Sequence, residues 1–295
     1  MVTKLKNPGK LPTALFIIPG ISLFSFSIIV PAVIAIINSF FVWTSITKPV
    51  WSGLKNYAEL IHDELFWLSL RNNLVFAVLT LIGQIGLGYV IAFLLKSRLV
   101  ELKKFHRTVM FFPVIISTVV LSFLWMLVYG NDYGILNNLL KITGLGQYAT
   151  AWLSNPDTVI NALAAPLIWQ WFGLYMLIFM GALETIPGDV LESAEIDGAV
   201  GLKKILYINI PMTYNTLKVA IVMCIAGIMK MFDHILVMTA GGPGNSSMVL
   251  ALYAYKVSFE SFDLGYGSTI SVGIIVFSLA ITFLAKKLLG GKRYE

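Results

Sequence analysis

The sequence predicts an all-α integral membrane protein in which six helical spans form a bundle. Of its 295 residues, 58% are hydrophobic and only 12% are charged, whereas soluble globular domains carry about 25% charged residues. The mean hydropathy is +0.83. The apolar residues gather into runs long enough for a transmembrane helix, which needs about 20 residues. We therefore expect spans at about 11–42, 73–95, 109–128, 159–183, 217–239 and 268–289.

The amino-terminal end is expected to be a short basic tail, residues 1–10, ahead of a permanent first span. Lys4, Lys6 and Lys10 precede an apolar run that is too long for a signal peptide and lacks a small-residue cleavage site. Residues 51–70, WSGLKNYAELIHDELFWLSL, mix aromatic and polar side chains before the second span. This mixture indicates a short amphipathic helix at the membrane surface. The rest of the chain, to about residue 290, forms one membrane domain.

Charge and rare residues exclude several classes of function. The net charge of +6 could indicate nucleic-acid binding, but in a membrane protein an excess of Lys and Arg first reports topology. The single cysteine, Cys224, lies in an apolar run, which excludes an intrachain disulfide and a cysteine-based metal cluster. His62, His106 and His234 lack the spacing of metal ligands. We expect no metal site, no cofactor bound by this chain and no catalytic residue.

The distribution of basic residues between the loops predicts the orientation of the chain. The amino terminus, the loops after the second and fourth spans, and the carboxyl tail hold 15 of the 21 Lys and Arg residues. The three loops on the other side hold five. Because positively charged loops stay in the cytoplasm, we expect both termini and the loop after the fourth span there.

That loop, residues 187–211, reads PGDVLESAEIDGAVGLKKILYINIP and is a polar interruption between two apolar spans. Pro187 suits the first turn of a helix, and Asp189 suits its positive end. One side of this helix is expected to be apolar, with Val190, Leu191, Ala194 and Ile196. Gly198 supplies the backbone freedom that ends a helix, and a second short helix closes at Pro211. The loop is therefore predicted to be two short helices joined at a glycine corner, facing a cytoplasmic partner or the lipid headgroups.

The same loop contains the pattern E-x-A-x-x-D-G-A-x8-I-x2-P, formed by Glu192, Ala194, Asp197, Gly198, Ala199, Ile208 and Pro211. It resembles the signature loop of permease subunits in bacterial binding-protein-dependent ABC importers. Four other stretches are similar to the first permease subunit of carbohydrate importers of the maltose and glycerol-3-phosphate type: VWSGLKNYAELIHDELFW, FHRTVMFFPVIIS, LIWQWFGLYMLIFMGALETIP and FDHILVMTAGGPGNSS. The resemblance extends from about residue 51 to residue 271.

This resemblance implies the fold of a type I ABC importer permease in a bacterial cytoplasmic membrane. It also implies that the 187–211 loop sits in a cleft of a cytoplasmic ATPase subunit and couples ATP use to the spans. The implied coupling residues are Glu192, Ala194, Asp197, Gly198, Ala199, Ile205, Ile208 and Pro211. The chain departs from the usual Ala, Phe, Leu and Pro of the family at Ser193, Ile205, Ile210 and Tyr214, which alters the fit to the ATPase.

The implied partners are a second homologous permease, two ATPase subunits that bind ATP and Mg, an extracytoplasmic solute-binding protein, membrane lipid and a sugar, with no nucleic acid. The sequence also indicates that ATP binds to another chain. Gly291 and Lys292 are followed by Arg293, without the preceding glycine and the following Ser or Thr of a phosphate loop. We expect a transport subunit rather than an enzyme.

Polar and aromatic residues within the spans are candidates for the substrate pathway. Trp169, Gln170 and Tyr175 could offer flat apolar faces and hydrogen bonds to a sugar, or could pack between helices. Lys230 and Asp233 are three residues apart and are expected on one helix face. Ionisable groups at membrane depth often serve function, and the alternative here is a structural ion pair.

A glycine-rich loop follows the fifth span. Its Gly241, Gly242 and Pro243 resemble the family's extracytoplasmic loop near the docked binding protein. The plainer alternative is a tight turn between two spans.

We therefore expect a permease subunit that imports a carbohydrate, an oligosaccharide in the first instance. A glycerol-3-phosphate-like or other small solute is the alternative within this class. An ion-coupled secondary transporter would instead show inverted repeats and paired buried acids, and Asp233 is the clear acid within a span. A membrane scaffold would not require the signature loop.

Overall fold

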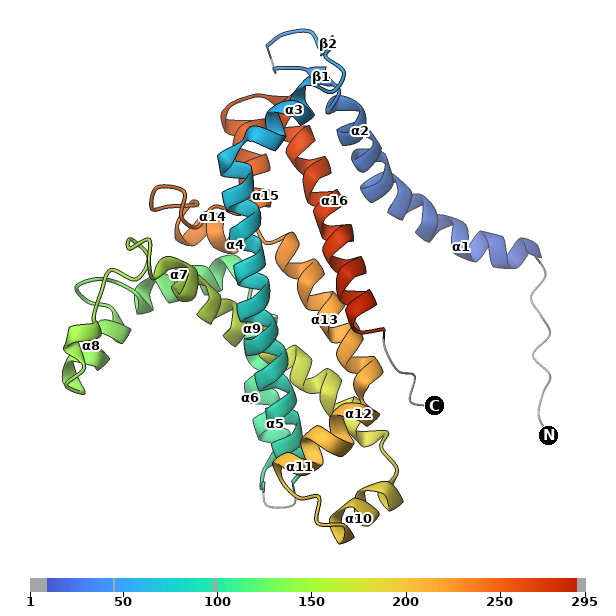
Figure 1. Ribbon diagram of the computed structural model, residues 1–295, viewed down its shortest axis with the longest axis vertical. Coiled ribbons are helices and arrows are strands. Elements are labelled where there is room, and N and C mark those ends of the chain that lie inside the picture. The colour runs from blue at the N-terminus through green and yellow to red at the C-terminus, as the bar shows by residue number, and fades with distance from the viewer. Residues whose placement is uncertain (1–9, 45, 98–99, 291–295) are drawn as a thin grey trace. The chain divides into compact units, whose positions relative to one another are not determined.

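A computed structural model describes residues 10–44, 46–97 and 100–290, which are mostly helical (Figure 1). The all-α membrane class predicted from the sequence is confirmed. The tail expected at residues 1–10, apart from the backbone of Lys10, and the stretch Gly291 to Arg293 lie outside the described residues. The chain divides into two compact units, residues 1–62 with 254–273 and residues 63–253 with 274–295.

The first unit begins with a long apolar helical segment. It consists of α1 (Lys10–Phe24), the π-helical turn η1 (Ser25–Ile29) and α2 (Val30–Asn38). The most apolar part of this segment, within residues 13–38, has no buried residue. Since each turn exposes large apolar side chains, this helix requires lipid or another chain around it.

The remainder of the first unit is held by polar side chains. A short hairpin pairs β1 (Phe41–Val42) with β2 (Val50–Trp51), antiparallel, with Phe41 opposite Trp51. The surface helix expected at residues 51–70 is shorter than predicted: α3 (Lys55–His62) ends before the next span. From α3, Asn56 Nδ2 donates hydrogen bonds to the carbonyls of Ser39 and Phe41, each at 2.9 Å. The unit also contains η5 (Lys256–Glu260).

The second unit contains long helices. The segments α4 (Glu64–Thr80), η2 (Leu81–Gly86) and α5 (Leu87–Lys96) form one continuous span of 33 residues. It starts at Asp63, whose carboxylate accepts the amides of Leu65 and Phe66 at 2.8 and 3.1 Å, as an N-cap does. The helix α9 (Val159–Glu184) has 26 residues, and α16 (Leu264–Leu288), shared by both units, has 25. With residues 13–38, the described chain has four helices long enough to span a membrane, or six if two bent pairs count.

The first bent pair corrects the third expected span. Instead of one helix over 109–128, α6 (Lys103–Ile115) and α7 (Thr118–Val128) meet at an angle of 100°. Ile116 and Ser117 between them are extended, with ψ of 134° and 133°. The break frees the carbonyl of Ile116, which accepts a hydrogen bond from Gln170 Nε2 at 3.0 Å. Buried irregular backbone in a span persists when side chains satisfy it in this way.

The second bent pair and a further break change the fifth expected span. The helical turns α11 (Leu202–Lys204), η4 (Ile205–Asn209) and α12 (Ile210–Met212) bend by 82° into α13 (Tyr214–Met229). After three non-helical residues, α14 (Asp233–Met238) begins. Lys230 and Asp233 were expected on one helix face, which is wrong, because the helix ends between them. The other short elements are α8 (Ile135–Ile142), η3 (Gly146–Tyr148), α10 (Gly188–Ile196) and α15 (Leu250–Tyr255).

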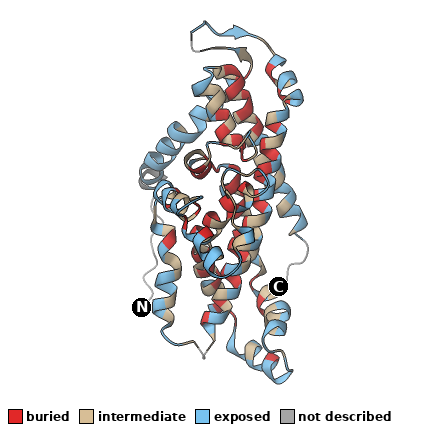
Figure 2. Cartoon of the chain, turned by 90° about the vertical axis from the view of Figure 1, so that its left-hand side faces the viewer, coloured by how far each residue is buried: buried red, intermediate tan, exposed pale blue. Residues whose placement is uncertain are grey.

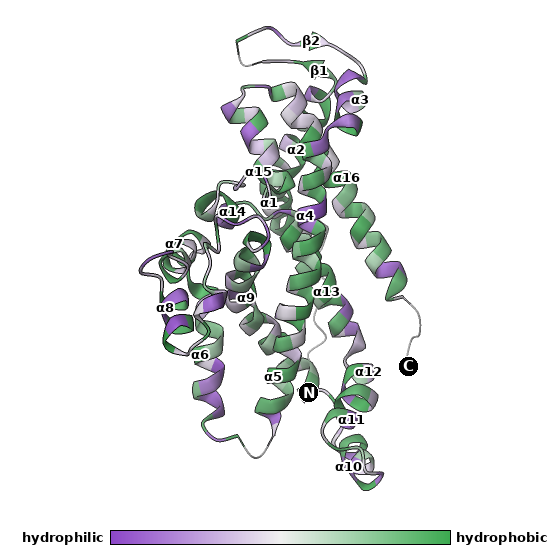
Figure 3. Ribbon diagram, turned by 60° about the vertical axis from the view of Figure 1, so that its left-hand side comes forward, coloured by the Kyte–Doolittle hydropathy of each residue, from purple (hydrophilic) through white to green (hydrophobic). Residues whose placement is uncertain are grey.

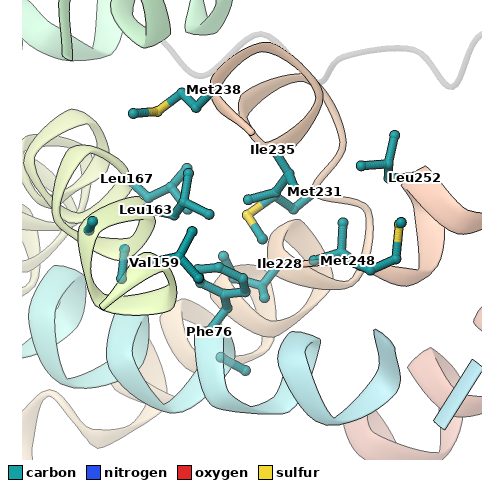
Figure 4. Packing of buried hydrophobic residues seen from close by; sticks show 14 of the residues in the cluster. Phe76, Val159, Leu163, Leu167, Ile228, Met231, Ile235, Met238, Met248 and Leu252 are labelled. Atoms are coloured by element: carbon teal, nitrogen blue, oxygen red, sulfur yellow. The ribbon is translucent and has the colours of Figure 1, made fainter. Parts of the chain in front are cut away.

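The core of the second unit lies along α9. Its first half contributes Val159, Leu163 and Leu167 to one buried cluster, with Phe76 of α4, Ile228 of α13 and Ile235 of α14 (Figure 4). Its second half contributes Met176, Phe179 and Leu183 to a second cluster. Many large apolar side chains elsewhere are exposed in this chain (Figure 2, pale blue), among them Phe16, Leu127 and Phe283. Such a surface is normal only against lipid or a partner.

Candidate functional site

The 187–211 loop follows directly from the last turn of α9. Lys96 Nζ donates a hydrogen bond to the carbonyl of Leu183 at 2.5 Å, and the amide of Ile186 donates to the same carbonyl at 3.4 Å. Pro187 then occupies the N-cap position of α10, and Asp189 lies in its first turn, where a negative charge faces the positive end of the helix dipole. The predicted start of this helix is thus found within one residue.

A glycine corner ends α10. The Gly198 amide donates to the carbonyl of Glu195 at 3.1 Å, and the Ala199 amide donates to that of Ala194 at 2.8 Å. These two bonds form a Schellman motif, which requires a left-handed residue after the helix. Gly198 has φ of +76°, a conformation in which a glycine avoids the steric cost of a side chain. The corner therefore has the local chemistry predicted from the sequence.

The loop has two arms, α10 before the corner at Gly198 and the helical turns from α11 to α12 after it. An ion pair joins the two arms. Lys204 Nζ contacts Glu195 Oε1 at 2.6 Å, and the lysine side chain is 15% exposed. Beyond it, Ile205 and Ile210 pack against the second buried cluster. Leu191 of α10 packs against the same cluster, so both arms contact the helical bundle, and the first arm is held in addition by its own hydrogen bonds and by this ion pair.

The loop exposes large apolar side chains where it is expected to meet water. Ile196 is 87% exposed, and so are large parts of Val200, Leu202, Leu206 and Tyr207. Figure 3 shows hydrophobic (green) and hydrophilic (purple) positions mixed along this loop. Of the four residues expected on one apolar side of α10, Ala194 is buried and Leu191 is partly buried, whereas Val190 and Ile196 are exposed. Exposed apolar groups next to acids are typical of a surface that binds another protein.

The structure places the expected coupling residues at different depths. Glu192, Asp197 and Gly198 are exposed, and Ala194 is buried. The partly buried ones are Ala199, Ile205, Ile208 and Pro211. The exposed acids and the corner are thus available to a partner, whereas Ala194 and Ile205 fix the position of the loop.

A cavity of about 290 Å³ lies in the second unit. Its walls come from α9, α13 and the break between α13 and α14, with contributions from η2 and α7. The polar groups in its lining are Gln84, Thr118, Tyr175, Cys224, Lys230, Asp233 and His234. Aromatic rings from Trp171 and Phe232 complete it. Flat rings with a few convergent polar groups are the usual form of a small-molecule site.

Three of the five expected pathway residues line this cavity, namely Tyr175, Lys230 and Asp233. The described residues contain no salt bridge between Lys230 and Asp233. Trp169 and Gln170 are not in the lining. Gln170 is 1% exposed and bonds to the break at Ile116, and Trp169 faces Trp125 at a ring distance of 6.1 Å.

Gln84 is one of the polar lining residues that the sequence analysis missed. Its Nε2 donates to the carbonyl of Leu167 at 3.0 Å, and Cys224 Sγ lies 3.6 Å from its Oε1. A glutamine inside an apolar span is itself costly and therefore informative, and that signal could have identified it. His234 is buried; its Nε2 donates to Leu163 O at 3.0 Å, and its Nδ1 lies 2.9 Å from Ser122 Oγ. It is a bonded packing residue. No three His, Cys, Asp or Glu side chains within residues 10–44, 46–97 and 100–290 come together as metal ligands.

The loop of residues 239–250 contains the three residues that are expected to contact the binding protein. Gly241 is buried, and Gly242 and Pro243 are partly buried, so the exposed tip is Gly244 and Asn245. Asn72 Nδ2, from α4, donates to the carbonyls of Ser246 and Met248 at 3.0 and 2.8 Å. The loop is thus fastened to a span.

The comparisons with known proteins agree with this geometry. Residues 84–290 match the family described as binding-protein-dependent transport system inner membrane component. The chain is 33% identical over 283 residues to the probable ABC transporter permease protein YurN of Bacillus subtilis (strain 168), covering 95% of this chain and 97% of that protein. It is 29% identical over 279 residues to the probable starch degradation products transport system permease protein AmyD of Thermoanaerobacterium thermosulfurigenes, covering 92% and 93%.

A solved structure shares the fold. It is a bacterial alginate ABC transporter in complex with an alginate pentasaccharide-bound periplasmic protein. One of its chains matches with a TM-score of 0.81 and 20% identity, over 94% of this chain and 93% of that chain. The extent of the family match and the full-length relatives lead to one conclusion: the chain belongs to the family of binding-protein-dependent transport system inner membrane components.

Proposed function

We propose that this chain is the membrane-spanning permease subunit of an ATP-driven importer that takes up a carbohydrate. An extracytoplasmic binding protein delivers the carbohydrate, a second homologous permease completes the pathway, and two ATPase subunits bind ATP and Mg on the cytoplasmic side. The chain itself contributes part of the solute pathway and the 187–211 loop that transmits the movement of the ATPase subunits, and it carries no catalytic residue.

One observation supports this proposal above the others: both arms of the 187–211 loop continue into walls of the cavity. The first arm follows α9, which lines the cavity from Leu167 to Tyr175, and Tyr175 lies about 14 Å along the helix from Glu184. The second arm leads into α13, which lines it from Met223 to Ile228. A push on the loop therefore displaces two cavity walls, as alternating access between inward and outward openings requires.

The surface of the loop suits an ATPase subunit. Glu192 and Asp197 are exposed beside the apolar side chains of Ile196 and Val200, so the loop offers an apolar contact with an acidic rim. Protein interfaces combine these features. The excess of basic residues on the same side of the chain supports a cytoplasmic position for the loop and for both termini.

The lining of the cavity favours a neutral solute. Lys230 and Asp233 balance each other in formal charge, whereas a phosphate-bearing solute would need an excess of basic groups. The rings of Trp171 and Tyr175, with the amide of Gln84, offer the apolar faces and hydrogen bonds that a sugar uses. The transport of starch degradation products by a relative, AmyD, points to an oligosaccharide. A glycerol-3-phosphate-like solute is the alternative.

The test is uptake into proteoliposomes that contain the complete complex, with Glu192→Ala compared with Glu101→Ala. Both glutamates are exposed, but Glu101 lies outside the 187–211 loop. We expect ATP-dependent uptake of an oligosaccharide to fall about tenfold or more for Glu192→Ala, because an interfacial charge loses its partner. Uptake by Glu101→Ala should match the unchanged protein.

Two results would contradict the proposal. Uptake that follows an ion gradient without ATP would indicate a secondary transporter. Equal uptake by both variants, with the complex fully inserted, would show that the acidic face of the loop does not transmit the action of an ATPase.

A further inference from the structure

A second cavity of about 290 Å³ lies beside the carboxyl-terminal end of α9, where α5, α6 and α9 meet. Its apolar wall comes from α5 and α9 and consists of Ala92, Leu95, Met180 and Leu183. Its polar side carries four basic residues and one acid: Lys96, Lys103, Lys104, Arg107 and Glu184. The cavity is separate from the one that the proposed transport uses.

The charges in this cavity are unbalanced. The single carboxylate, Glu184, lies 3.8 Å from Arg107 Nη2 and is 67% exposed, so this ion pair is loose. Lys96 Nζ already donates a hydrogen bond to the carbonyl of Leu183. Among the described residues, Lys103 Nζ donates to the backbone carbonyl of Lys96 at 3.4 Å. A formal excess of three positive charges therefore borders an apolar wall, and a bound anion would offset it.

We propose that this cavity binds the phosphate headgroup of an anionic phospholipid. Lys103, Lys104 and Arg107 would hold the phosphate oxygens, and the glycerol and the first acyl carbons would lie against Leu95 and Met180. A lipid combines these two chemistries in one molecule, which a free phosphate does not. The site also lies at the ends of two candidate spans, Glu64–Lys96 and Val159–Glu184, at the depth where headgroups are found.

The position of the site connects it to the 187–211 loop. Lys96, one of its lining residues, bonds to Leu183, four residues before Pro187. A headgroup that neutralises this cluster would hold the end of α9 in place. If the chain functions as proposed above, ATP-dependent uptake should increase when the membrane contains anionic lipid.

The test measures lipid binding and therefore does not depend on transport. The complete complex is placed in nanodiscs of phosphatidylcholine, with or without phosphatidylglycerol, and retained lipid is counted by native mass spectrometry. Lys103→Gln with Lys104→Gln is compared with Lys286→Gln with Lys287→Gln. The latter pair ends α16 and is exposed, so both double variants lose the same charge.

We expect retained phosphatidylglycerol to fall only in the Lys103/Lys104 variant. A basic residue near an anionic surface contributes about fivefold in affinity, so the two lysines together should contribute up to about thirtyfold. Inorganic phosphate, added in excess, should not displace the lipid. This result would support a lipid site.

Each other outcome would overturn the inference. Equal losses in both double variants would indicate general attraction of anionic lipid to basic surfaces. Displacement by inorganic phosphate would indicate a site for a soluble anion. Unchanged lipid retention, with weaker binding of the ATPase subunits by the Lys103/Lys104 variant, would identify the cluster as a protein contact.

Discussion

The two loops of the second unit, at residues 187–211 and 239–250, are held in opposite ways. Both turn the chain through glycines with positive φ, Gly198 in one and Gly241 in the other. The 239–250 loop is fastened by side chains of α4, and its Met248, Val249 and Leu250 are buried. The 187–211 loop is held by local hydrogen bonds and by the packing of Leu191, Ile205 and Ile210 against the second buried cluster. It leaves most of its large apolar side chains exposed.

This difference predicts that substitutions in the two loops have different effects. Loss of one hydrogen-bonding side chain from α4 should loosen the bundle around the 239–250 loop. Loss of the corner in the 187–211 loop should leave the bundle intact and disturb only the surface that a partner contacts. Substitutions at three positions test this contrast.

The largest effect is expected for Asn73→Ala. Asn73 is fully buried; its Nδ2 donates to the carbonyl of Ile228 at 2.9 Å, and its Oδ1 accepts the amide of Leu250 at 2.9 Å. The substitution leaves the buried amide of Leu250 unpaired, at a cost of about 1–3 kcal/mol. It also removes one of the two hydrogen bonds to the carbonyl of Ile228, which keeps the amide of Met231 at 3.1 Å. We expect a clear fall in the melting temperature of the purified complex.

The matched control is Asn138→Ala on α8, where the side chain is exposed. Its effect should stay within about 0.5 kcal/mol, as for most surface substitutions. If both variants melted at the same temperature, the 239–250 loop would not be fastened through α4 in the way described.

An intermediate effect is expected at Gly198, and it should appear in transport rather than in stability. A side chain added there would meet no atom within 4 Å, so the cost arises from the left-handed backbone, about 1–2 kcal/mol. Gly198→Val should reduce ATP-dependent uptake about 5- to 30-fold. Gly198→Asn should retain more uptake, because asparagine tolerates this conformation better.

Uptake in proteoliposomes and the melting temperature are measured together for both variants. Equal losses of uptake for Asn and Val would show that side-chain bulk in the partner's cleft matters, and not the corner. A fall in melting temperature as large as that of Asn73→Ala would remove the contrast between the two loops.

The parts that could be predicted from the sequence are those with local causes. The fourth span was expected at 159–183, and α9 runs from Val159 to Glu184, because a long apolar run ends just before Pro187. The corner at Gly198 follows from a glycine after a short helical pattern. In both cases the signal and the structure lie within the same few residues.

The parts that could not be predicted depend on distant contacts. The break at Ile116 is stabilised by Gln170, 54 residues away, and the apolar pattern continues through it. Asn73 acts on Leu250, 177 residues away. Lys230 and Asp233 were expected on one helix face, since nothing local marks the end of α13. Polar residues inside spans were the available signal, and their partners required the fold.

The smallest effect is expected for Glu195→Gln, which removes the ion pair with Lys204 across the corner. Glu195 is 58% exposed in its side chain, and such pairs contribute about 0.2–1 kcal/mol, less at high salt. The Ala199 amide, bonded to Ala194, should therefore exchange its hydrogen about 1.5 to 5 times faster at low salt.

Glu184→Gln, which removes the looser pair with Arg107 at 3.8 Å, is the control and should leave the Ala199 amide unchanged. At high salt the difference between Glu195→Gln and the unchanged protein should disappear, because salt screens the pair while the Schellman bonds remain. An increase that persisted at high salt would mean that the carboxylate of Glu195 supports the corner through something other than its charge. The 187–211 loop would then be fastened by neutral contacts, like the 239–250 loop, and the contrast between them would be one of degree.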